Sequence, residues 1–349
     1  MRIASTFGAV LCCLFYSKIA AQTNTTTAVP TYLPIPSSAA SVPLNAAGYA
    51  LEDFGNGAFM VTEGVYQALF IVSTTGIVLV DAPPTIGRKI LFAIGNTTHL
   101  PVTHLIYSHS HADHIGGASL ITAAYPNATI IAHANTFTQL NLTGDPSRPL
   151  PTKTFQDEYK LRVANHTLQL SYKGINHVPG NIFIYHSASK TLMLVDIVFP
   201  GWVPFDRLGE VSYVPGFIKA HDQILAYDFL HYIGGHLSRS GIRDDVQTQK
   251  NYVTDLFGNC KSAIEASATD DPVLGAEKIV EAALAANPGN SWAEFRAYLD
   301  VVNNYCANVT GEIWDGVLAG VDVFGESNAN VMVESLRIDY GVLGPFGAM

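Results

Sequence analysis

Three histidines and one aspartate lie within six residues of this chain, and no other feature constrains its fold as strongly. The segment Tyr107-Ser-His-Ser-His-Ala-Asp-His-Ile-Gly-Gly117 continues an apolar run at 103–108. Imidazole and carboxylate groups together suit zinc, manganese or iron, and they are supplied here by His109, His111, Asp113 and His114. The alternative, a histidine-rich surface turn, is disfavoured by the apolar strand before it. The pattern therefore predicts a metal site at the end of a strand.

Three further candidate ligands lie at the ends of other predicted strands. His177 stands in a turn-rich segment, Asp196 ends an apolar run, and His236 follows two glycines that allow a tight turn. Alone, each would more often be structural than functional. A carboxylate at the end of an apolar strand is costly unless it is paired or ligated. With the first cluster, the three residues bring the total to five histidines and two aspartates, enough for two metal ions.

Apolar, β-branched runs separated by turn residues predict two blocks of strands. Two such halves with helices beside them predict an α/β sandwich of two sheets with helices outside. No linker separates the halves, so 49–245 is predicted to be one domain, and 246–349 a mainly helical extension. Strands are expected at 58–62, 67–72, 77–81, 103–108, 159–163, 168–171, 182–186 and 192–195, and helices at 83–94, from about 114, and at 246–256, 278–286 and 292–305.

The N-terminus has the pattern of a secretory signal peptide, predicted at 1–21. Arg2 precedes an apolar run at 3–16, and small residues allow cleavage before Gln22. A membrane anchor is the alternative, but the run falls short of the roughly 20 residues of a spanning helix. Residues 22–48 are rich in Thr, Pro, Ala and Ser and are predicted to be a flexible lead-in.

Cysteine usage and glycosylation sequons agree with export. Only Cys260 and Cys306 remain after the predicted signal, either as a disulfide or as two buried thiols. We therefore expect a secreted, N-glycosylated protein. Asn-x-Ser/Thr sequons occur at Asn24, Asn96, Asn127, Asn141, Asn165 and Asn308.

Composition limits the partners. Of 349 residues, 48% are hydrophobic and 14% charged, which excludes a largely disordered chain. The net charge is −10 and no basic block is present, so nucleic acid is not expected as a partner. We expect a small-molecule substrate and no membrane anchor, and the sequence leaves the oligomeric state open.

On these motifs, from about residue 55 to 240, the chain resembles the metallo-β-lactamase-fold hydrolase superfamily with its His-x-His-x-Asp-His signature. The resemblance implies an αββα four-layer sandwich with the site at one edge of the paired sheets. Asp81 matches the superfamily's first motif and would support the site from behind, or else be a turn residue before two prolines. The implied ligands are His109, His111 and His177 for one metal, Asp113, His114 and His236 for the other, and Asp196 bridging both.

The bridging Asp196 resembles the glyoxalase-II-like and lactonase-like branches of that superfamily. The best-known β-lactamase branch has Cys there and Lys three residues on, where this chain has Phe199. Many lactonases that open acyl-homoserine lactones have Tyr at that place, and glyoxalase II has a basic C-terminal glutathione-binding segment. Both features are absent here. His111 also differs from the carboxylate of the oxygen-reducing diiron branch.

These features predict a secreted dinuclear hydrolase that opens an ester, lactone or thioester bond of a small, apolar molecule. A metal-bridged hydroxide would attack the carbonyl, and Asp113 would pass a proton to the leaving group. Two divalent ions are expected, with zinc favoured. The aromatic segment 199–205, with Phe199 and Trp202, is expected either to wall the substrate pocket or to be a core-packing loop.

Three alternatives remain: a phosphodiesterase or sulfatase on the same site, a β-lactamase-like amide hydrolase, and a binding protein without catalysis. A chain so poor in basic residues disfavours a polyanionic substrate. The presence of all seven ligands disfavours the binding protein.

Overall fold

The computed structural model describes residues 29–347. The predicted signal peptide at 1–21 and the sequon at Asn24 lie outside the described residues. The chain divides into an N-terminal unit up to Thr31 and a compact unit from Tyr32 on, which contains every helix and strand described below.

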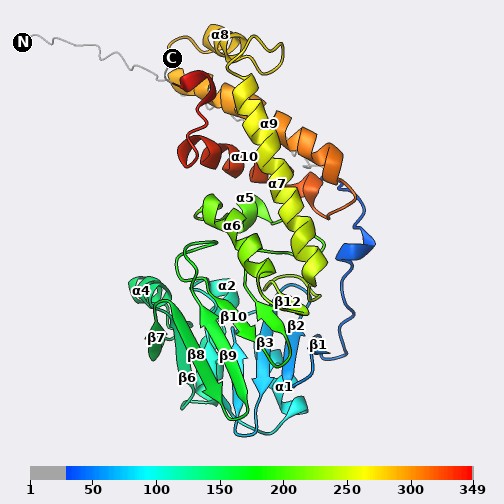
Figure 1. Cartoon of the computed structure of the whole chain (residues 1–349), viewed down its shortest axis with the longest axis vertical. Coiled ribbons are helices and arrows are strands. Elements are labelled where there is room, and N and C mark those ends of the chain that lie inside the picture. The colour runs from blue at the N-terminus through cyan, green and yellow to red at the C-terminus, as the bar shows by residue number, and fades with distance from the viewer. Residues whose placement is uncertain (1–28, 348–349) are drawn as a thin grey trace, which may run out of the picture. The chain divides into compact units, whose positions relative to one another are not determined.

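The first sheet has seven strands in the order β1 to β7 (Figure 1). Strands β1 to β4 pair antiparallel, whereas β4 to β7 pair parallel. Strands β3 and β4 are buried on both faces, as their continuous apolar runs predict. The strands are Ala50–Asp53, Ala58–Thr62, Gln67–Val72, Ile77–Val80, Val102–Ile106, Thr129–His133 and Lys153–Phe155.

The second sheet has five strands in the order β12-β11-β10-β9-β8. Its pairs are antiparallel except for β11 and β12, which run parallel. Strand β8 lies at the edge and turns Glu158, Lys160 and Arg162 to solvent. The strands are Glu158–Val163, His166–Ser171, Phe183–His186, Thr191–Met193 and His231–Ile233.

The two sheets enclose an apolar core to which both contribute, for example Ile106 from the first and Ile184 from the second. Helices cover the outer faces: α1, α3 and α4 pack on the first sheet, and α6 and α7 on the second. The layers confirm the predicted αββα architecture. These helices are Arg88–Thr97, Ala118–Ala124, Ala134–Thr143, Val214–Leu225 and Arg243–Ala266, with the short α2 at Ala112–Ile115 and α5 at Asp206–Glu210.

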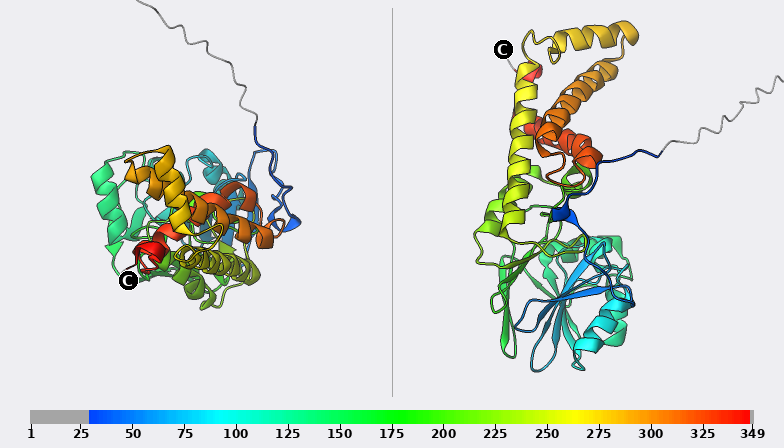
Figure 2. Two further views of the ribbon diagram at one scale, coloured as in Figure 1. Left: turned by 90° about the horizontal axis from the view of Figure 1, so that it is seen from above. Right: turned by 90° about the vertical axis from the view of Figure 1, so that its right-hand side faces the viewer.

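Helix α7 leads from the second sheet into a helical part with α8 (Ala276–Ala286), α9 (Ser291–Trp314) and α10 (Val321–Ile338) (Figure 2). Cys260 of α7 and Cys306 of α9 form a buried disulfide that ties the two helices together. The boundaries of the predicted domains stay predictions. Short 3-10 helices lie at Ser37–Ala39 and Gly344–Phe346.

The segment before β1 packs against loops of the same unit. The Trp202 indole N–H donates to the Ala39 carbonyl at 3.3 Å, and the Arg239 guanidinium donates to the Ser38 carbonyl at 2.7 Å. Residues of the predicted lead-in thus reach the loops that follow β11 and β12.

Two helical features differ from the expectations. The helix predicted at 83–94 begins only at Arg88, because 84–87 form turns and Gly87 has a φ of 51°. Helices α4, α5, α6 and α10 lie outside the predicted helices. In the part of the chain that the structure describes, no helix is both long and apolar enough to cross a membrane.

Candidate metal centre

The centre forms where two pairs of parallel strands end. Strands β4 and β5 run parallel in the first sheet, and β11 and β12 in the second, so each pair ends at one edge of its sheet. Asp81 follows β4 and His109 follows β5. Asp196 and His236 follow β11 and β12 in the same way. The topology thus explains why residues far apart in sequence meet.

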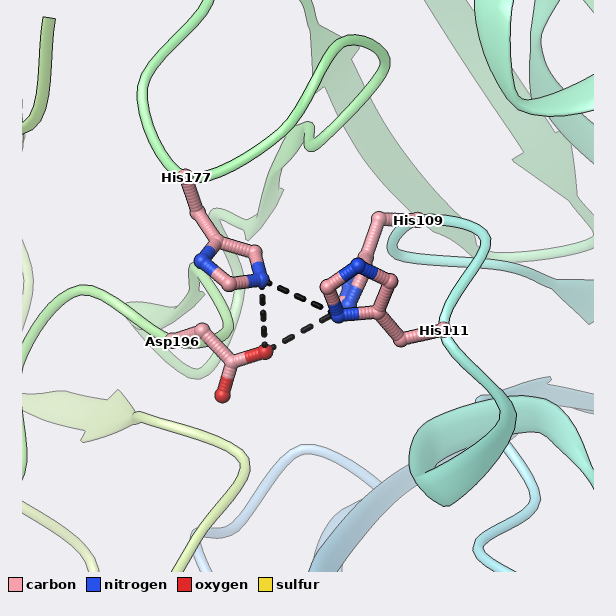
Figure 3. Close-up of side chains that lie close together, drawn as sticks. All are labelled: His109, His111, His177 and Asp196. Carbon is pink, nitrogen blue, oxygen red and sulfur yellow. Dashed lines mark hydrogen bonds and ion pairs between the residues drawn. The ribbon is translucent and has the colours of Figure 1, made fainter. Parts of the chain in front are cut away.

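The first group of donors consists of His109, His111, His177 and Asp196 (Figure 3). One donor atom from each lies within 4.8 Å of the others. The Asp196 Oδ2 atom is 3.3 Å from Nε2 of both His109 and His177. Nδ1 of His111 faces Nε2 of His177 at 3.1 Å.

The second group consists of Asp113, His114 and His236, again with donor atoms within 4.8 Å of one another. Nε2 of His114 lies 3.4 Å from Asp113 Oδ2 and 3.2 Å from Nε2 of His236. Helix α2 supplies the first two residues, and the loop after β12 supplies the third.

Asp196 lies between the two groups. Besides its contacts in the first group, its Oδ2 is 3.2 Å from Nε2 of His114, and its Oδ1 is 2.8 Å from Nε2 of His236. This is the position that a bridging ligand requires. The structure thus brings together all seven residues that the sequence indicates, while their role as ligands stays a prediction.

The residues present fit a pair of divalent cations. Two pairs of ring nitrogens face each other, His111 with His177 and His114 with His236. Two ring nitrogens that face each other in this way can share only one proton between them. Nε2 of His109 is buried and has no hydrogen-bond partner among the described residues. Cations between these nitrogens would satisfy the converging lone pairs.

Burial and the neighbouring charges together determine the protonation of the donors. It lowers the pKa of His109 and His111, and that of His177 to about 4, so these rings are in the neutral form that metals bind. Burial also opposes the charge of Asp196, but the histidines around it, His114 first, hold its pKa well below the usual value. Burial likewise lowers the pKa of His114, but the nearby carboxylates outweigh it and raise that pKa to about 9.

Asp81 is connected to the first donor group through Ser108. It is fully buried, and its Oδ1 accepts a hydrogen bond from the Ser108 backbone N–H at 2.8 Å. The Ser108 hydroxyl in turn bonds Nδ1 of His109 at 3.0 Å. Burial raises the pKa of Asp81 to about 6. These contacts favour the supporting role over that of a turn residue alone.

Gly235 allows His236 to reach the centre. Its φ is 88°, and a Cβ atom there would lie 2.5 Å from Cγ1 of Val195 and 3.0 Å from Cε1 of His114. Oε1 of Gln67, on β3, accepts from the Gly235 N–H at 3.1 Å and fixes this turn. Gly235, the second of the two glycines noted in the sequence, is therefore required for steric reasons.

A cavity of about 710 Å³ opens beside the donors. Phe199 and Trp202 line it, at the place expected for the pocket wall. Its lining also includes residues that the sequence did not indicate, namely Tyr66, Glu210, Leu237 and Phe324, because no local pattern marks them. No Lys or Arg is among the described residues that line the cavity.

A family model described as the Metallo-beta-lactamase superfamily matches residues 61–239, a range that includes Asp81 and all seven donors. The 2,4-dinitroanisole O-demethylase subunit alpha of Nocardioides sp. (strain JS1661) is 28% identical over 190 residues, which are 53% of this chain and 56% of that protein. The chain thus spans little more than half the length of this curated relative.

Two solved structures share the fold. A metallo-beta-lactamase from Pontibacter korlensis matches with a TM-score of 0.50 and 17% identity, over 58% of this chain and 97% of that one. The metallo-beta-lactamase IND-7 gives the same TM-score and identity, over 59% of this chain and 100% of that one. At this identity the likeness concerns the fold alone.

Proposed function

The chain belongs to the metallo-β-lactamase superfamily, and on that premise we propose that it is a metal-dependent hydrolase for an ester, lactone or thioester of a small, apolar molecule. Members of this superfamily are mostly hydrolases. The observation that carries the proposal is the pair of donor groups beside an apolar cavity.

Two divalent ions, with zinc favoured, would be held by the two donor groups, with Asp196 between them. Such ions, when bound, lower the pKa of a water molecule and polarise a carbonyl group. Asp113 lines the cavity with a side chain that is 38% exposed, so its carboxylate can carry a proton to the leaving group. The buried His109 and His177 would serve only to hold a metal.

The cavity wall favours an apolar, uncharged acyl group over an anionic one. Phe199, Trp202, Phe205 and Phe324 supply aromatic surface, and no cationic side chain in the described lining would bind a phosphate, sulfate or carboxylate. This argues against the phosphodiesterase, sulfatase and β-lactamase alternatives. The name of the curated relative specifies a small aromatic substrate, 2,4-dinitroanisole, which supports an aromatic substrate here.

Among the branches of the superfamily, we assign the chain to the glyoxalase-II-like and lactonase-like group. The assignment rests on Asp196 at the bridging place and on Phe199 where the β-lactamase branch has Lys.

A hydrolysis screen tests the proposed activity. The metal-loaded protein is offered aryl esters, lactones, thioesters, β-lactams, phosphodiesters and 2,4-dinitroanisole, each with and without a chelator. We expect chelator-sensitive cleavage of carbonyl esters, lactones or thioesters. Activity confined to phosphodiesters, or hydrolysis that a chelator leaves intact, would contradict the proposal.

We further propose that the protein is secreted and N-glycosylated. The Cys260–Cys306 disulfide supports this, because disulfides persist in oxidising compartments. The five sequon asparagines within the described residues are all exposed, at Asn96, Asn127, Asn141, Asn165 and Asn308. Expression of the full chain in a eukaryotic host should yield a protein in the medium that begins at Gln22 and loses mass on enzymatic deglycosylation. Retention in the cell without glycan would contradict this.

A further inference from the structure

A strained turn lies at the rim of the cavity. The four residues Arg207–Glu210 all adopt the left-handed conformation, with φ values of 53°, 58°, 74° and 52°. Only Gly209 can do so at little cost, since the other three carry a Cβ atom that clashes with the carbonyl in this conformation. Such strain persists only where the surrounding structure enforces it, and it concentrates at functional sites.

Two sets of contacts enforce this turn. On one side, Asn328 of α10 is fully buried; its amide oxygen accepts from the Leu208 N–H at 2.6 Å, and its amide nitrogen donates to the Pro204 carbonyl at 2.9 Å. On the other side, the N–H and hydroxyl of Ser212 donate to the His177 carbonyl at 2.8 and 2.7 Å. The turn is thus held between the helical extension and the metal centre.

The consequence of the turn is the position of Glu210. Its side chain lines the cavity, it belongs to neither donor group, and no ion pair neutralises it within the described residues. The neighbouring Arg207 binds Glu334 of α10 at 3.0 Å instead. Glu210 is therefore a free carboxylate beside the catalytic centre.

Aromatic rings surround the same cavity. Phe199 and Phe205 meet edge to face with centroids 5.5 Å apart, and Trp202 and Phe324 line the wall near Gly320. Aromatic faces combined with one unpaired carboxylate recognise organic cations, because the ring quadrupole and the negative charge both attract them.

We propose that Glu210 and these aromatic side chains form a subsite for an organic ammonium group on the substrate. The acyl end of that substrate would lie at the metal centre, and the cavity of about 710 Å³ has room for both ends. The acyl assignment rests on the proposed function, whereas binding of the ammonium group depends only on the cavity.

Calorimetry with the metal-loaded protein tests the subsite without catalysis. The probes are phenyltrimethylammonium and its neutral carbon isostere tert-butylbenzene. The cation should bind the natural protein about tenfold more tightly than the isostere, and Glu210→Gln should abolish this preference. Glu210→Asp, which keeps the charge, should retain part of it. Glu312→Gln removes the same charge from an exposed position on α9 outside the cavity and should keep the full preference.

Equal affinity for the two probes, or a preference that survives in Glu210→Gln, would overturn the subsite. So would an equal loss in Glu312→Gln, because the net charge alone would then explain the effect. Circular dichroism and metal content of each variant establish that the turn and the centre are intact.

A comparison of the hydrolysis of acetylthiocholine with that of its neutral isostere, 3,3-dimethylbutyl thioacetate, tests the subsite and the proposed hydrolase activity separately. A kcat/KM about tenfold higher for the cationic thioester, lost in Glu210→Gln, supports both. If the protein binds the ammonium probe but hydrolyses neither thioester, the hydrolase assignment to this substrate class fails and the subsite stands. If it hydrolyses both equally, the hydrolase stands and the subsite fails.

Discussion

Asp81, directly after β4, and Asp196, in the turn after β11, both adopt the left-handed conformation, with φ values of 62° and 63°. Aspartate tolerates this conformation better than most residues, because its short polar side chain can bond nearby backbone groups. The left-handed backbone at these residues directs one carboxylate to the Ser108 backbone and the other among the histidines. The position of both carboxylates therefore depends on this backbone conformation.

The substitution Gly235→Ala tests the steric role of this single residue. In Gly235→Ala the added Cβ would clash with Val195 and His114 and would strain a φ of 88°. We expect a loss of about 1–3 kcal/mol in the free energy of unfolding and a loss of metal from the second donor group. Chemical denaturation and elemental analysis measure the two effects.

Gly258→Ala is the matched control. Gly258 lies in α7, and apart from its chain neighbours and the backbone of its own helix no heavy atom lies within 4 Å of the place that an alanine methyl group would take. Alanine there should stabilise the protein by about 0.5–1 kcal/mol and leave the metal content unchanged. An equal change in the free energy of unfolding and in metal content in the two alanine variants would contradict the steric role of Gly235.

His221 predicts a pH dependence of stability. This histidine of α6 is fully buried beside Gln249, and burial lowers its pKa to about 4. The unfolded chain takes up the proton near pH 6.5, so between pH 6.5 and 4 the unfolded state binds more protons than the folded state. Stability therefore falls as the pH drops, by about 2 kcal/mol between pH 7 and 5 from this residue.

Urea unfolding of His221→Gln at pH 7 and pH 5 measures this contribution. The variant should lose about 2 kcal/mol less than the natural protein over that range. An identical loss in both proteins would show that His221 does not titrate as described.

At the scale of elements, the strands were more predictable than the helices. Strands β2 and β3 match the expected ranges, because continuous apolar and β-branched runs between turn residues leave few alternatives. Helix α10 was missed because its middle, Gly325-Glu-Ser-Asn-Ala-Asn330, has low helix propensity. Its packing against α5, α7 and α9 makes it helical, and that packing is not visible in local sequence.

The same reason explains which site residues the sequence revealed. Four of the seven donor residues lie in one compact motif after β5, and Asp196 and His236 follow β11 and β12. In contrast, Tyr66, Glu210 and Phe324 reach the cavity only through the tertiary arrangement. Their sequence positions carry no signal of their own.

The substitution Phe324→Ala tests whether α10 forms part of the substrate pocket. Phe324→Ala removes a ring from the cavity wall, so KM for an aromatic ester should rise about tenfold while the metal content stays the same. Val323→Ala, next along the helix and outside the cavity lining, is the control and should leave KM unchanged. An unchanged KM in Phe324→Ala would show that the helical extension does not contribute to substrate binding.

For the whole molecule, the helical extension and the metal-binding sandwich together build one site. The cavity draws on Tyr66 in the first block of strands, the donors at the strand ends, and Phe324 in the extension. The net charge of −10 agrees with a cavity whose described lining has carboxylates but no cationic side chain. We therefore expect neutral or cationic substrates rather than anionic ones.

We infer that two metal ions occupy the two donor groups and that Asp196 lies between them. Elemental analysis of the purified protein and of Asp196→Asn, with hydrolysis measured on the same samples, tests it most directly. We predict about two divalent ions per chain in the natural protein, and in the variant loss of metal with at least a hundredfold lower kcat/KM. Asp222→Asn, an exposed ion-pair variant, should resemble the natural protein. Full metal content and activity in Asp196→Asn would show that Asp196 is not needed to bind the two metal ions.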